Sequence, residues 1–211
     1  MPADFRSFAP GDLSQDDAYA VLVAAISPRP IALVSTMSPE GKPNLAPFSF
    51  YMAGGVSPLS LAFSPTDGPH GPKDTLTNVN ETGEFVVNTV HRAMADAMNA
   101  SSFGYGSGVS EWKAAGLTML PSVDVRPYRV AESLVQFECR LFQVIRHGGG
   151  IGAANYVIGE VVRMHVSTGI WANLVDLRLL ARMGGPRYLD AEELEIFDLP
   201  RPTTPAVPEE G

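Results

Sequence analysis

Short apolar runs, separated by glycine and proline, dominate the pattern of hydrophobic and polar positions along this chain. The runs are rich in β-branched and aromatic residues and have the length of strands rather than of helices. We predict strands at Ile31–Met37, Asn44–Tyr51, Leu59–Ser64, Glu84–Val90, Val135–Ile145 and Tyr156–Val166. The turn Ser38–Pro43 joins the first two into a hairpin, and the glycine-rich segment His147–Asn155 joins the last two into another.

Helical patterns are fewer. Ser14, followed three residues later by Asp17, is typical of a capping box, and the apolar run Ala18–Ile26 behind it predicts a helix packed on a core. The segment Asp74–Thr82 predicts a second helix, and Gly83 is well placed to end it. Further short helices are expected at Arg92–Ala100 and Trp112–Gly116, and a short helix or extended arm at Trp171–Leu180.

Strands divided by turns, with few helices between them, favour a mainly β fold over a doubly wound α/β sheet. We expect the sheet to be closed, because closure removes the exposed edges that such apolar strands would present. A length of 211 residues suits one domain, which we place at residues 1–199 because no linker or repeat interrupts it. The proline-rich segment 200–211 is expected to be a frayed tail.

The formal charge of −8 argues against nucleic acid as the main partner, because phosphate-backbone binding needs a basic surface. No apolar run is long enough to span a bilayer, so no membrane association is expected. The single cysteine, Cys139, cannot form an internal disulfide. Together with the lack of a signal-peptide pattern at Met1–Pro10, this favours a cytoplasmic protein.

One candidate ligand site is the start of the helix predicted at Asp74–Thr82. A loop of glycine and proline delivers Lys73, Asp74 and Thr75 to this helix start, where free N–H groups and a partial positive charge attract phosphate. Lys73 would add a full positive charge and Thr75 a donor, while Asp74 would cap the helix. Taken alone, the pattern fits a capped surface helix with nothing bound at least as well.

Two further segments have ligand-binding character. Amides, prolines and aromatics alternate along Asn44–Phe50, which could form one wall of a pocket for a flat heteroaromatic ring. The glycine pair within Arg182–Tyr188 allows close approach of a ligand to the backbone. Taken alone, the first also fits a strand edge with a core phenylalanine, and the second an ordinary turn.

Several common sites are not supported by the sequence. The run Gly148–Ala153 loosely fits a dinucleotide-binding glycine motif, but a strand rather than a helix follows it. The histidines share no metal-ligand spacing, so we expect no metal site. No nucleophile elbow of the hydrolase type occurs, and no catalytic side chain is predicted.

Taken together and in order, these segments resemble the flavin reductase-like family with the FMN-binding split-barrel fold. That family includes flavoredoxins and the flavin reductase components of two-component monooxygenases. The resemblance extends from about Ser27 to Tyr188. It is carried by Ser27–Thr36, Gly41 with Asn44–Phe50, Lys73–Thr75 with Asn78, Glu84–Asn88, Glu138-Cys139, Ile158–Val162, and Arg182–Gly185 with Tyr188.

The resemblance implies a six-stranded antiparallel Greek-key split barrel that works as a homodimer, with FMN near the subunit interface. Ser35 and Thr36 would then lie beneath the flavin, and Ser64 with Lys73, Asp74 and Thr75 would hold its phosphate. The ring would be lined by Asn44, Leu45, Ala46, Pro47, Phe48 and Ser49. Asn88 would sit close to the cofactor, and Arg182 would contribute at the margin of the site.

The activity implied is reduction of FMN by NADH or NADPH, with hydride passing to flavin N5. The protein would supply placement and electrostatics rather than an acid or base. The glycine-rich loop Ser101–Ser110 would cover the nicotinamide. The sequence does not identify the final electron acceptor, which could be free flavin for a partner monooxygenase, another electron-transfer protein, ferric iron or oxygen. The alternatives are a flavoredoxin-like electron carrier that keeps its FMN, or a split-barrel binding protein without enzymatic activity.

Overall fold

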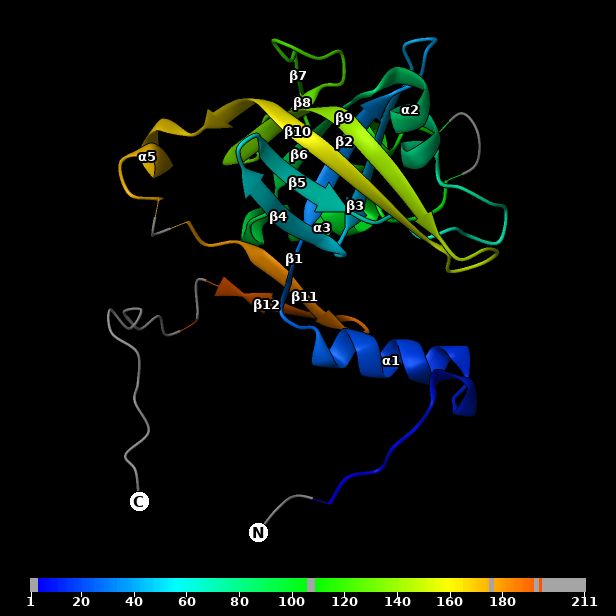
Figure 1. The fold of residues 1–211 in the computed structure, drawn as a ribbon. Helices are drawn as coiled ribbons and strands as arrows, with labels where there is room; N and C mark the ends of the chain where they lie inside the picture. Colours follow the sequence, from blue (N-terminus) through cyan, green and yellow to red (C-terminus); the bar gives the residue numbers. More distant parts are fainter. Residues whose placement is uncertain (1–3, 106–108, 175–176, 192–193, 195–211) are drawn as a thin grey trace.

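A seven-stranded antiparallel sheet is the central feature of the computed structural model, which describes residues 4–105, 109–174, 177–191 and 194 (Figure 1). Its strands lie in the spatial order β3-β2-β6-β9-β10-β5-β4. In chain order they are β2 (Ala32–Met37), β3 (Pro43–Phe48), β4 (Tyr51–Val56), β5 (Leu59–Phe63), β6 (Glu84–Thr89), β9 (Val135–His147) and β10 (Ala154–Val166). The mainly β architecture and both predicted hairpins are confirmed.

The two outermost strands of this sheet, β3 and β4, follow one another in the chain. Only Ser49 and Phe50 separate them, so the predicted single strand Asn44–Tyr51 is wrong: a bend divides it. Because consecutive residues end up at opposite edges, the sheet curls until those edges meet at this corner. Among the described residues β3 and β4 are not paired with each other, so the expected closed six-stranded barrel is instead an open seven-stranded one.

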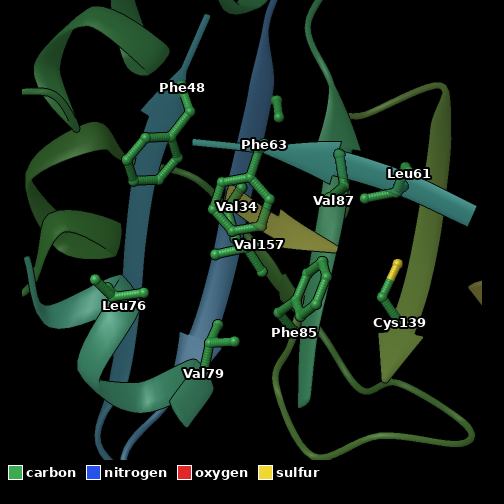
Figure 2. Close-up of a cluster of buried hydrophobic side chains, with 11 residues drawn as sticks. Val34, Phe48, Leu61, Phe63, Leu76, Val79, Phe85, Val87, Cys139 and Val157 are labelled. Carbon is green, nitrogen blue, oxygen red and sulfur yellow. The ribbon is translucent and has the colours of Figure 1, made fainter. Parts of the chain in front are cut away.

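The main core fills the inside of the curled sheet (Figure 2). Phe48, Phe63 and Phe85 pack in a row, with ring centroids 5.3 and 5.4 Å apart. Gly159 on β10 faces this row, and a Cβ atom there would lie 2.3 Å from the ring of Phe85. The glycine therefore makes room for the aromatic packing. A second core cluster, which includes Trp112, lies on the other face of β2 and β3.

Short helices cover the sheet. The predicted helices at Asp74–Thr82 and Arg92–Ala100 are confirmed: the first is α2 (Asp74–Thr82), and the second is a 3-10 turn followed by α3. Gly83 ends α2 in the left-handed conformation, with φ 69°. The remaining short elements are the 3-10 turns Pro10–Asp12 and Arg92–Met94, α3 (Ala95–Ala100), α4 (Glu111–Ala115), α5 (Thr168–Trp171), β7 (Met119–Leu120) and β8 (Arg129–Val130).

A small sheet that the sequence pattern did not reveal lies beside the main one. Its order is β1 (Arg29–Pro30), β11 (Leu180–Gly184) and β12 (Arg187–Asp190). Of the short helix or extended arm expected at Trp171–Leu180, α5 includes only Trp171, Leu180 is the first residue of β11, and residues 175–176 lie outside the described residues. Pairing with β1, more than 140 residues earlier in the chain, makes Ala181 and Arg182 part of a strand, and no local pattern reports it.

Helix α1 (Gln15–Ala25) forms where predicted but does not pack as predicted. Ser14 caps it, accepting a hydrogen bond from the Asp17 backbone N–H at 3.1 Å. Of its residues only Val23 is buried, while Tyr19, Val21 and Leu22 are exposed. Figure 1 shows the helix lying below the small sheet, away from the curled sheet. The expectation that its apolar residues pack on this chain's own core is therefore wrong for Tyr19, Val21 and Leu22 and holds only for Val23.

No helix among the described residues is both long and apolar enough to cross a bilayer. The tail at 200–211, part of the loop Ser101–Ser110 (residues 106–108) and the end of the expected domain lie outside the described residues.

Candidate functional site

A cluster of amide and hydroxyl side chains joins β2, β3 and α2. The Asn44 amide donates to the hydroxyl oxygens of Thr36 at 3.1 Å and Thr75 at 3.0 Å. The Asn78 amide also donates to Thr36, at 3.0 Å. Thr36 and Thr75 are buried, so these bonds hold Asn44 in one orientation at the edge of the sheet. We call these four residues the amide–hydroxyl cluster.

The helix start beside this cluster has no side-chain cap. Lys73 is the N-cap residue of α2 and makes no side-chain cap hydrogen bond, and the Leu76 N–H bonds the Lys73 carbonyl at 2.9 Å. No side chain among the described residues bonds the remaining N–H groups of the first turn, those of Asp74 and Thr75. The expectation that Asp74 caps the helix is wrong, because Asp74 is already the first helical residue and its side chain cannot reach back as a cap does. These N–H groups are therefore available to an external acceptor.

The Lys73 ammonium lies over the ring of Phe48, 5.4 Å from its centroid. Partial desolvation by the neighbouring protein lowers the pKa of Lys73 from its ordinary value. Lys73 therefore places a positive charge beside both the start of α2 and Phe48, the last residue of β3.

Ser35 and Thr36 were predicted to lie together beneath the flavin. Because neighbouring side chains along a strand point to opposite faces, the two residues lie on different sides of β2. Thr36 belongs to the amide–hydroxyl cluster, whereas Ser35 faces the other side of β2, opposite Leu45. Ser35 is fully buried, and its hydroxyl has no hydrogen-bond partner among the described residues. Thr36 is thus placed beside the candidate phosphate site, and Ser35 is not.

The segment Asn44–Ser49 also divides between the two faces of β3. Asn44 lines a cavity of about 570 Å³ at one end, and Pro47, Phe48 and Ser49 line a second cavity of about 280 Å³ at the other. Leu45 is fully buried, and Ala46 packs against the main core. Only the ends of the segment therefore offer side chains to a ligand.

The cavity at Asn44 contains an acid that the sequence pattern did not single out. Glu111, the first residue of α4, lines it together with Asp74. Partial burial and then the like charge of Asp74 raise the pKa of Glu111. The Glu111 carboxylate would repel an anionic ligand in this cavity. A phosphate is therefore more favourable beside Lys73 and the N–H groups at the start of α2.

The cavity at Ser49 contains a second residue that was missed, Arg29. In the sequence it stands out only as part of Ser27–Thr36, yet it is 5% exposed and its Nε lies 3.5 Å from the Ser49 hydroxyl. Arg182, predicted at the margin of the site, lines the same cavity and pairs with Arg29 across β1 and β11. An arginine buried in a strand that only tertiary pairing creates carries no local signal.

Ser64 lies at the end of β5 beside an apolar cavity of about 310 Å³. The walls include the rings of Phe50, Tyr51 and Tyr156. The Ser64 hydroxyl is buried and has no hydrogen-bond partner among the described residues, which is a cost unless a ligand or water supplies one. Burial raises the pKa of Tyr51 to about 12, so its hydroxyl stays neutral.

Asn88 does not reach these cavities. It is fully buried, its amide donates to the Leu33 carbonyl at 3.0 Å, and its side-chain oxygen accepts from the Val130 N–H at 2.9 Å. Both polar ends are thus used in holding β2 and β8 to β6. These bonds give Asn88 a structural role, and its place close to a cofactor stays a prediction.

The residues present fit a flavin mononucleotide in two respects. An uncapped helix start with Lys73 suits a phosphate, and the exposed edge of β3, with its proline and aromatic end, suits a flat ring. Ser64, whose hydroxyl has no partner among the described residues, lines a separate cavity and not the one at Asn44. The structure assembles Thr36, Asn44, Lys73 and Thr75, while Ser35, Leu45 and Asn88 stand apart.

Comparison with known proteins points in the same direction. Residues 24–178 match the model of the flavin reductase like domain. An uncharacterised protein of Halalkalibacterium halodurans is 39% identical over 92% of this chain and 95% of its own length.

Solved structures agree with this match. Component B of nitrilotriacetate monooxygenase from Bacillus cereus superposes with a TM-score of 0.87 at 29% identity, covering 94% of this chain and all of that one. A protein from Shewanella frigidimarina, described as a flavin reductase with a split barrel domain, superposes with a TM-score of 0.76 at 21% identity, over 94% of this chain and 100% of that one. The split-barrel fold is thereby confirmed.

Proposed function

Since the chain belongs to the flavin reductase-like family, we propose that it binds FMN and uses NADH or NADPH to reduce it. The flavin, when bound, supplies the chemistry by accepting a hydride at N5. The protein's share is to bind both molecules, to orient them and to keep water away from the reacting faces. This share needs no acid or base, in keeping with the polar but uncharged character of the amide–hydroxyl cluster.

The observation that carries the proposal is the uncapped start of α2 with Lys73 beside it. The free N–H groups and the lysine together favour a dianionic phosphate. Thr75, held by Asn44 at 3.0 Å, fixes how the first turn of the helix sits against β3. A phosphate at that point would leave the attached ring to lie along the edge of β3.

A titration of FMN with the purified protein, followed by flavin fluorescence, tests this assignment. Saturable quenching is expected for the wild type, and Lys73→Ala should raise the dissociation constant roughly tenfold to a hundredfold, as loss of a charge-assisted hydrogen bond does. Lys113→Ala, which removes an exposed lysine from α4, is the matched control and should bind FMN normally. Equal binding by all three proteins would refute the phosphate assignment.

The electron donor and acceptor are tested separately. Oxidation of NADH or NADPH in the presence of FMN, followed by absorbance, is expected. Because the chain resembles component B of a monooxygenase, we propose that reduced flavin passes to a partner monooxygenase. If FMN stays bound through dialysis and neither nicotinamide nucleotide is oxidised, the alternative of an electron carrier served by a protein donor replaces the reductase.

We propose further that the protein works as a homodimer. Tyr19, Val21, Leu22 and Ile26 expose 56%, 62%, 48% and 58% of their surfaces along or beside α1. Apolar groups this exposed mark an interaction surface. Light scattering should report a dimer that Val21→Asp converts to monomer, whereas Asn80→Asp at an exposed position on α2 should remain dimeric. A wild-type monomer that binds FMN fully would contradict the proposal.

A further inference from the structure

Two arginines line the cavity at the Ser49 end of β3. Arg29 and Arg182 lie directly opposite each other in the pairing of β1 with β11. The chain as a whole carries a formal charge of −8, yet no aspartate or glutamate is among the residues that line this cavity. Arg182 also lines a neighbouring cavity that includes Arg92, Asp96 and Asp190, so the excess of positive charge is local to the cavity at Ser49.

Arg29 carries a buried charge that no acid neutralises. Its Nη1 donates to three backbone carbonyls, those of Val23 at 2.6 Å, Ile26 at 2.7 Å and Met183 at 2.9 Å. No carboxylate among the described residues forms an ion pair with it. The end of α1 supplies partial negative charge, but a full counter-charge is missing. Burial of a cation is costly until an anion joins it.

Arg182, which pairs with Arg29 across the two strands, is held in place by contacts with its own hairpin. Its guanidinium donates to the Tyr188 hydroxyl and to the Gly185 carbonyl, and it lies over the Tyr188 ring, 4.6 Å from the centroid. It also forms no ion pair among the residues that the structure describes. A planar guanidinium fixed in this way presents its remaining donors in a set direction, which suits the oxygens of a phosphate.

We infer that the cavity between Arg29 and Arg182 is an anion subsite that binds a phosphate group of the nicotinamide nucleotide. This inference rests on the proposed function. FMN has a single phosphate, and the start of α2 with Lys73 is already suited to it. The second anionic ligand of such a reaction is the pyrophosphate of the nicotinamide dinucleotide. At about 280 Å³ the cavity suits part of a dinucleotide rather than all of it.

The first test measures binding without turnover. Calorimetric titration of the full-length protein with inorganic pyrophosphate should show binding, and Arg182→Gln should weaken it roughly tenfold to a hundredfold. Arg187→Gln is the matched control, because Arg187 lies on the same hairpin, is exposed and does not line the cavity. Arg29 is left intact because it also anchors α1. No binding, or equal binding by Arg182→Gln, would overturn the inference.

The second test distinguishes the two phosphates. With FMN present, Arg182→Gln should raise KM for NADH at least tenfold more than KM for reduced nicotinamide riboside, which has no phosphate. The FMN dissociation constant should stay unchanged in this variant, whereas Lys73→Ala should raise it. If Arg182→Gln weakens FMN binding instead, Arg182 serves the flavin and the inference fails. If the wild type oxidises no nicotinamide, the proposed function fails, and pyrophosphate binding alone decides the subsite.

Discussion

Replacing Thr36 with valine should destabilise the protein by removing the centre of the amide–hydroxyl cluster. Valine has nearly the shape of threonine, so the change removes the hydroxyl with little effect on packing. Thr36 is fully buried and accepts from two amides, Asn44 at 3.1 Å and Asn78 at 3.0 Å. Asn44 keeps its bond to Thr75, but the Asn78 donor has no other acceptor among the described residues.

The expected cost follows from that count. One buried amide left without an acceptor costs about 1–3 kcal/mol, and the weakened bond at Asn44 adds roughly 0.5–1.5 kcal/mol. The free energy of unfolding should therefore fall by about 1.5–4.5 kcal/mol. For a protein of this size, that corresponds to a decrease in melting temperature of roughly 3–18 °C.

Urea unfolding followed by circular dichroism measures the difference. Thr75→Val should lower the free energy of unfolding by only about 1 kcal/mol. The change removes the hydroxyl that accepts a hydrogen bond from the Asn44 amide, but that amide keeps its other bond, to Thr36. Thr77→Val, at an exposed position in the same helix, should change stability by less than about 0.5 kcal/mol. If Thr36→Val unfolds with the same midpoint as Thr77→Val, the cluster does not organise this part of the molecule.

Three further outcomes are expected. Gly159→Ala brings a Cβ atom 2.3 Å from the Phe85 ring and should cost about 1–3 kcal/mol on urea unfolding, while Gly169→Ala, with open space around it, should cost little. Burial alone would raise the pKa of Glu138. The hydrogen bonds that its carboxylate accepts from the backbone N–H groups of Asp124 and Val123, together with His165, have the larger effect and lower the pKa. Its stabilising effect is thus complete above the ordinary glutamate pKa and lost as the pH falls through the lowered value. Unfolding measured across this range should depend less on pH in Glu138→Gln, and equal slopes would count against this account. Glu111→Gln should tighten FMN binding roughly twofold to fivefold in the fluorescence titration, because it removes a carboxylate beside the phosphate; weaker binding would contradict this.

Much of the local structure could be predicted from the sequence. Gly83 ends α2 as expected, because a left-handed residue at that point suits glycine, and Ser14 caps α1 through its own side chain. The hairpin of β9 and β10 follows from two β-rich runs around a short glycine-rich connection. In each case the determining interactions lie within a few residues of chain. A pattern read over that span can report them.

The candidate site was predictable only in part, for a related reason. The segments that form it, at Lys73 and Asn44, stood out by composition and do come together. Alternation along β2 implies that Ser35 and Thr36 face opposite ways, but only packing against α2 decides which of them joins the cluster. Asn88 looked equally suited to a ligand, yet burial directs both of its polar ends to backbone groups.

The sequence by itself determined the strand-rich character, the positions of the main turns, the start of α2 as a phosphate-binding candidate and the family to which the ordered motifs point. The tertiary structure alone decided that the sheet stays open between β3 and β4, that α1 leaves its apolar side uncovered, and that Arg29 meets Arg182. The physical reason is that strand pairing and burial join residues far apart in the chain. The free energy of those contacts depends on the whole fold and not on any local run of residues.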